Sequence, residues 1–152
     1  MNNYMHPIEL LVLTKYFPDT GMQAVSQGEW WRLLTPIFLH FGLMHILFNM
    51  LWMWQLGGPF ENRLGTGELS IFILGAGVIS NLAQYFYDPD IPFGGMSGVV
   101  YGLLGYYWAQ GRLNPGFGMV LHKSIVIMML VLVTLAYQGG VVSSPTGVAG
   151  SP

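Results

Sequence analysis

Four long apolar segments, separated by short polar stretches, dominate this sequence. They cover residues 41–56, 69–86, about 95 or 97 to 109, and 119–137. Charged residues make up 8% of the chain, about a third of the roughly 25% that is typical of a soluble domain. So few charges cannot cover the surface of a soluble globule that is 53% hydrophobic. The pattern therefore predicts an all-α bundle of about four transmembrane helices.

The 152 residues are enough for one domain. We expect residues 1–40 to form an N-terminal and first-loop region, residues 41–137 to form the membrane helices, and residues 138–152 to form a loop-like tail. We also expect Trp30, Trp31 and Arg32 to lie at the membrane interface. The first apolar helix should stop at residues 57–59 (Gly-Gly-Pro), residues 61–68 should form a polar loop, and residues 110–118 should form a loop that contains Gly and Pro.

Charge and cysteine content exclude several classes of function. The net charge is −2 without a basic cluster, so nucleic acid is not an expected partner. The chain has no Cys, which excludes disulfides, thiolate nucleophiles and Cys-ligated metals. Arg63 and Arg112 place the loops after the first and third apolar segments in the cytoplasm. The first and third segments then begin on the same, outer side of the membrane.

Three polar side chains lie inside or at the end of apolar segments, where each costs free energy unless it is paired or used. His45 and Asn49 are four residues apart and share one helix face. They are either a hydrogen-bonded pair that joins two helices, worth about 0.6 kcal/mol, or part of a site. Ser97 lies among glycines, as Gly95-Met96-Ser97-Gly98, and is either a helix-packing residue or a nucleophile.

Taken together, these residues favour a site. The topology places His45 and Ser97 at a similar depth below the outer surface. A Ser at a helix N-terminus has backbone N–H groups nearby that can stabilise a developing oxyanion. His45 and Asn49 could add side-chain donors to the same hole. This layout is typical of acyl transfer.

At this point the sequence resembles the rhomboid family of intramembrane serine proteases. The resemblance covers about residues 28–137 and rests on an ordered set of motifs: Glu29-Trp30-Trp31-Arg32, the run from His40 to Asn49, Leu56-Gly57-Gly58 with Glu61 and Arg63-Leu64-Gly65, and the run from Gly94 to Tyr101. It implies that Ser97 is the nucleophile and that His45 and Asn49 form the oxyanion hole with the Ser97 N–H. It also implies cleavage of transmembrane segments of membrane proteins, with no cofactor and no metal.

One part of the family pattern is missing. Rhomboids take their general base from a His on a sixth helix, in an Ala-His-x-x-Gly-like context, and no His follows His122 here. The chain resembles family helices two to five, and we expect it to be a fragment that is inactive alone. The alternative is a pseudoprotease that binds membrane helices without cutting them. The expected location is the bacterial inner membrane, as a multi-pass protein.

Overall fold

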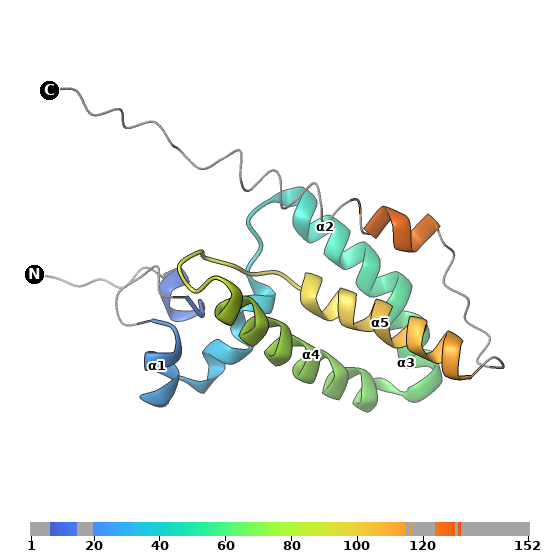
Figure 1. The fold of residues 1–152 in the computed structure, drawn as a ribbon, viewed down its shortest axis with the longest axis horizontal. Coiled ribbons are helices and arrows are strands. Elements are labelled where there is room, and N and C mark those ends of the chain that lie inside the picture. Colours follow the sequence, from blue (N-terminus) through green and yellow to red (C-terminus); the bar gives the residue numbers. More distant parts are fainter. Residues whose placement is uncertain (1–6, 15–19, 115, 117–123, 130, 132–152) are drawn as a thin grey trace, which may run out of the picture. The chain divides into compact units, whose positions relative to one another are not determined.

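The regular elements that the structure describes are all helices (Figure 1). The computed structural model describes residues 7–14, 20–114, 116, 124–129 and 131. The chain divides into two units, Met1–Tyr106 and Tyr107–Pro152, and His45, Asn49 and Ser97 all belong to the first unit. The prediction of an all-helical fold is therefore confirmed for the described residues.

Short helices make up the region before the first long helix. They are the 3-10 helices Pro7–Leu10, Trp30–Leu33 and Thr35–Phe38, and α1, Met22–Ser26. Trp30 and Trp31 are exposed. Arg32 is fully buried within the protein: it pairs with Glu29 and donates to the backbone carbonyls of Glu9 and Val12. A guanidinium carries five donors, so it can be buried where several oxygen acceptors converge.

The helix that begins after Gly42 continues past the predicted stop at residues 57–59. α2, Leu43–Trp52, leads into a π-helical turn, Met53–Gly57, and then into α3, Gly58–Leu64. Pro59 lies in the first turn of α3. The fixed φ of proline already suits a helix, but proline has no N–H to donate to the carbonyls of the preceding turn. The Gly-Gly-Pro sequence therefore marks a change of helix type and not an end.

The predicted loop at residues 61–68 is also mostly helical. Gly65 alone separates α3 from α4, and its φ of 100° lies in the left-handed region that favours glycine. The Thr66 hydroxyl donates to the Glu61 carboxylate at 2.7 Å across this turn. The positive φ of Gly65 lets this one residue end α3 and begin α4, and the hydrogen bond between Thr66 and Glu61 spans the turn.

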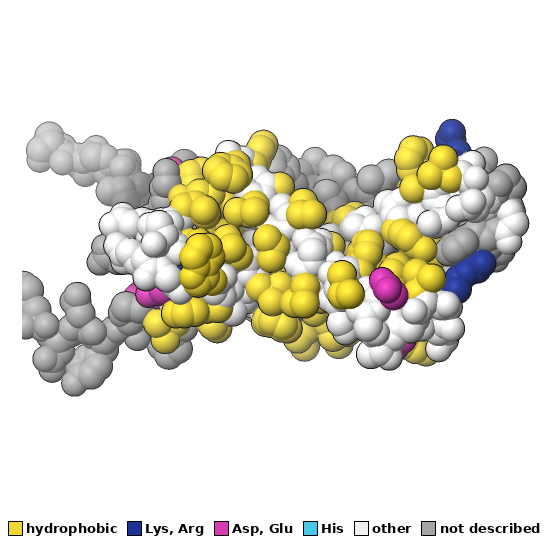
Figure 2. Space-filling model, turned by 90° about the horizontal axis from the view of Figure 1, so that it is seen from below, with side chains coloured by type: hydrophobic (Ala, Val, Ile, Leu, Met, Phe, Trp, Pro, Cys, Tyr) yellow, Lys and Arg dark blue, Asp and Glu magenta, His cyan; other side chains and the backbone are white. Residues whose placement is uncertain are grey.

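α4, Thr66–Tyr87, agrees with the predicted helix at residues 69–86. Its 22 residues span about 33 Å, enough for a hydrocarbon core of about 30 Å. Among the described residues it is the one helix that is both long and apolar enough to cross a membrane. Apolar side chains of α4, including Ile71, Ile79 and Phe86, are exposed, and Figure 2 shows hydrophobic side chains over much of one face.

α5, Ser97–Leu113, packs its N-terminal part against α4 through glycines. A Cβ on Gly102 would lie 3.2 Å from the Ala76 Cβ, and one on Gly98 would overlap the Ser80 side chain. In Figure 1 the beginning of α5 runs between α2 and α4. This close approach places Ser97, the first residue of α5, beside α4.

In the second unit the helix runs to Leu113, beyond the predicted end at residue 109. The Asn114 amide donates to the Gln110 side chain at 2.6 Å, and Arg112 lies over the Trp108 ring at 5.3 Å. A cation in the last turn also interacts favourably with the helix dipole. Of the predicted helix at residues 119–137, the structure describes residues 124–129 and 131, which are helical. The rest of it and the tail at residues 138–152 lie outside the described residues.

Candidate active site

The N-terminal half of α2 carries His45 and Asn49 on one face. His45 is half-buried in the first turn, and Asn49 follows one turn later with 5% of its surface exposed. Within the described part of the chain, the Asn49 Nδ2 is buried and has no hydrogen-bond partner. A buried donor without an acceptor costs about 1–3 kcal/mol, so such a group calls for an explanation. The Asn49 Nδ2 therefore makes no hydrogen bond to His45 or to another described residue.

Gly95 brings the segment before α5 against these two side chains. Its φ is 116°, in the region that favours glycine. A Cβ at Gly95 would lie 2.6 Å from Cε1 and 2.8 Å from Nε2 of His45, and 3.5 Å from Nδ2 of Asn49. The position therefore needs glycine for two reasons, backbone conformation and space. Gly95, two residues before Ser97, is the residue of this segment that comes close to the His45 and Asn49 side chains.

The N–H groups at the start of α5 are the remaining donors of this region. The Val100 N–H donates to the Met96 carbonyl at 3.0 Å, which is the first bond of the helical pattern. The preceding N–H groups, including that of Ser97, have no acceptor within the helix because of their position in it. The Gly95 N–H is already used, since it donates to the Pro36 carbonyl at 2.9 Å. An anion beside Ser97 would thus meet helix N-terminal donors and the positive end of the dipole.

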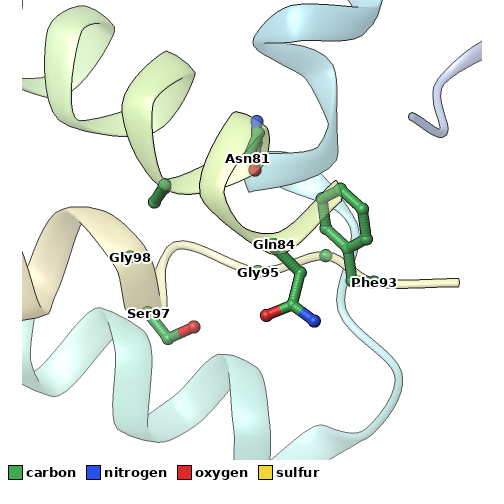
Figure 3. A pocket seen from close by; sticks show the side chains of 8 residues that line it. Asn81, Gln84, Phe93, Gly95, Ser97 and Gly98 are labelled. Atoms are coloured by element: carbon green, nitrogen blue, oxygen red, sulfur yellow. The ribbon is translucent and has the colours of Figure 1, made fainter. Parts of the chain in front are cut away.

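The Ser97 side chain is half-buried and lines a pocket beside α4. The pocket has a volume of about 120 Å³ and is lined by Ser80, Asn81, Gln84, Phe93, Gly94, Gly95, Ser97 and Gly98. Figure 3 shows Ser97 and Gln84 pointing into the same space. The segment that carries Ser97 therefore has two neighbours. The pocket lies on its α4 side, and the side chains of His45 and Asn49 from α2 lie beside Gly95.

The three polar residues of α4 in this pocket were not predicted as site residues. The signal was present, because Ser80, Asn81 and Gln84 interrupt an otherwise apolar helix and residues 80 and 84 share one face. Asn81 is buried and donates to the Leu33 carbonyl at 2.9 Å, so its amide connects α4 to the 3-10 helix Trp30–Leu33. Gln84 is the residue whose carboxamide faces the pocket in Figure 3.

The other histidines have different positions. The His40 ring lies next to that of His45, with 5.2 Å between the centroids and 63° between the planes. His122, and His6 near the N-terminus, lie outside the described residues. The described histidines are therefore those at the start of α2 and in the segment before it.

Comparison with known proteins identifies the family. The model of the rhomboid domain matches residues 27–150. The rhomboid protease GlpG of Salmonella choleraesuis (strain SC-B67) and that of Salmonella paratyphi A (strain ATCC 9150 / SARB42) are each 43% identical to the chain over 113 residues, which is 74% of this chain and 41% of each relative. The chain thus spans about two fifths of the length of the curated relatives it matches. The extent of the family match and the identity to these proteases show that the chain belongs to the rhomboid family.

Proposed function

We propose that the chain carries the nucleophile and the oxyanion hole of a rhomboid-type intramembrane serine endopeptidase. Ser97 is the nucleophile, and His45, Asn49 and the Ser97 N–H bind the oxyanion. The observation that carries this proposal is the contact at Gly95, where a buried Asn49 amide without a partner and the Nε2 edge of His45 meet the backbone that leads to Ser97. Hydrogen-bond donors that are positioned in advance for the charge of the transition state make the largest single contribution to rate acceleration in many enzymes.

The reaction follows the chemistry of acyl transfer. The Ser97 Oγ attacks the carbonyl carbon of a peptide bond, its proton passes to a base, and the carbonyl oxygen becomes the oxyanion. When this intermediate collapses, the C–N bond breaks, the amine takes up the proton and leaves, and an acyl-enzyme remains. Water then attacks the ester, releases the acid and restores the Ser97 hydroxyl.

Water for the second step fits the pocket beside α4. A volume of about 120 Å³ holds several water molecules, because one requires only about 10–15 Å³ by the same measure. A water needs 2–4 polar partners, and the hydroxyls and carboxamides of the lining residues can provide them. We propose that Gln84 orients such a water near Ser97, since both side chains point into this space (Figure 3).

The substrates we propose are transmembrane segments of other proteins, within a bacterial inner membrane that this chain crosses several times. α4 and the exposed apolar side chains of α2, such as Leu43, Leu47 and Met50, support a lipid environment. The backbone hydrogen bonds of a membrane helix must break locally before its peptide bond can reach Ser97. Segments that unwind near the outer surface are therefore the favoured substrates.

The family's sixth-helix histidine, the general base of the proposed reaction, has no counterpart in this sequence. The family takes it from an Ala-His-x-x-Gly helix, and no His follows His122. Without a base a serine is a weak nucleophile at neutral pH. We therefore propose that the chain alone is inactive or nearly so and becomes active when such a helix is supplied.

A labelling experiment tests this proposal. The chain in detergent is treated with a fluorophosphonate probe, with and without a separately expressed helix bearing Ala-His-x-x-Gly, and Ser97→Ala is the control. We expect labelling and cleavage of a transmembrane substrate only with the added helix and only with Ser97. Capture of the substrate without labelling or cleavage would instead identify a binding protein. Strong Ser97-dependent labelling of the chain alone would contradict the dependence on a sixth-helix base.

A further inference from the structure

We propose that His40 is a positioning residue that holds the His45 imidazole against Gly95. This inference rests on the proposed function, because its purpose is to keep an oxyanion donor in place. His40 lies in the segment of residues 36–40, just before α2.

The backbone of this segment packs directly on the segment before Ser97. The Gly95 N–H donates to the Pro36 carbonyl at 2.9 Å. A Cβ on Gly94 would lie 2.7 Å from the Leu39 Cβ and 2.9 Å from the Pro36 oxygen. Residues 36–39 therefore lie in contact with the Gly94-Gly95 backbone, and His40 continues directly from them.

The His40 ring is held by its own chain turn. Its Nδ1 lies 3.2 Å from the Phe38 carbonyl oxygen. A carbonyl can only accept, so Nδ1 carries the proton in this contact. The opposite nitrogen, Nε2, is buried and has no hydrogen-bond partner among the described residues.

The His45 ring lies in contact with both neighbours. The His40 ring meets it in an edge-on arrangement at 5.2 Å between centroids, and Gly95 lies beside its Cε1 and Nε2 atoms. We infer that these two contacts limit the rotation of the half-buried imidazole. An oxyanion donor must lie about 2.7–3.1 Å from the oxyanion position, so a ring that turns away from Gly95 would lose this function. Removing the His40 ring should free His45 while the backbone contact through Pro36 remains.

Nitrogen NMR of the histidine-labelled chain in detergent micelles tests the inference directly. His45 signals are assigned with His45→Gln. We expect one sharp set of His45 signals in the unmodified chain, and broadened or averaged signals in His40→Ala. His40→Phe, which keeps an aromatic edge, should retain the sharp set. Phe41→Ala, an exposed neighbour, is the matched control and should change nothing.

Each outcome decides the inference. Unchanged His45 signals in His40→Ala, in a chain that folds, would overturn it. If His40→Ala does not fold, His40→Phe decides, since altered His45 signals in a folded His40→Phe would overturn it too. With the added helix, His40→Ala should lower kcat between about tenfold and hundredfold with KM unchanged, less than the loss of a whole donor. If Ser97 is never labelled in the unmodified chain, the peptidase proposal fails, while the NMR result still reports on His40.

Discussion

Gly95→Ala adds a single methyl group at the point where the Ser97 segment meets α2. The new Cβ would lie 2.6 Å from Cε1 and 2.8 Å from Nε2 of His45, closer than real Cβ atoms come to other atoms. The φ of 116° adds backbone strain of about 1–3 kcal/mol for a residue other than glycine. The His45 ring must move away, so one oxyanion donor is displaced. We expect the free energy of unfolding to fall by about 2–4 kcal/mol, from strain and overpacking together.

Two measurements in detergent check this prediction. Unfolding followed by circular dichroism reports stability, and cleavage by the chain with the added Ala-His-x-x-Gly helix reports catalysis. Displacing one oxyanion donor should lower kcat by about 10²–10³-fold. Gly75→Ala is the matched control, because a Cβ at Gly75 meets nothing within 4 Å. This helical replacement should stabilise the chain by about 0.5–1 kcal/mol and leave cleavage unchanged.

The geometry at Gly95 would be refuted by a clear result. If Gly95→Ala in detergent unfolds at the same denaturant concentration as the unmodified chain and cleaves substrate at the same rate, His45 does not lie where the structure places it. A loss of stability with full cleavage activity would support the packing contact between Gly95 and His45 but would show that His45 is not part of the oxyanion hole.

Three further changes test separate contacts. Asn49→Ala removes a buried side chain whose Nδ2 has no hydrogen-bond partner among the described residues, so the free energy of unfolding in detergent should change by less than about 1 kcal/mol, while Ser97-dependent cleavage falls by about 10²–10³-fold. Gly98→Val would overlap the Ser80 side chain, whose Oγ lies 2.2 Å from a Cβ at this position, and should cost about 1–3 kcal/mol or more in the same unfolding assay. Arg32→Met removes the charged donor of two backbone carbonyls; a loss of at least about 2 kcal/mol is expected, and unchanged thermal stability would contradict the buried position.

The long apolar helix was the easiest element to predict. Residues 69–86 have no charge and no proline, and α4 extends only a few residues beyond these bounds. The breaks were harder. Gly57-Gly58-Pro59 has the composition of a helix end, yet the chain continues through a π-helical turn. Whether a glycine and proline pair ends a helix depends on the packing of the next turn, which local composition does not contain.

Some residues of the candidate site could be predicted from the sequence and others could not. His45, Asn49 and Ser97 could be selected because polar groups in apolar segments are costly and four-residue spacing places two of them on one face. The pocket residues of α4 were missed because nothing in the spacing of one helix says which neighbour it faces. Arg32 was grouped with Trp30 and Trp31 at the membrane interface because Trp rings prefer the headgroup level. Its burial against the carbonyls of Glu9 and Val12 depends on distant parts of the chain, which this local pattern does not contain.

The sequence by itself determined that this chain is helical, that it suits a membrane, and which few polar side chains lie in apolar segments where they cost free energy. These follow from composition and from periods of 3.6 residues, which are local properties. Only the tertiary structure decided that Gly95 brings the Ser97 segment onto α2, that Ser97 opens toward α4, and that His40 lies against His45. Those contacts join residues that are far apart along the chain, and they depend on how closely glycines allow two backbones to approach.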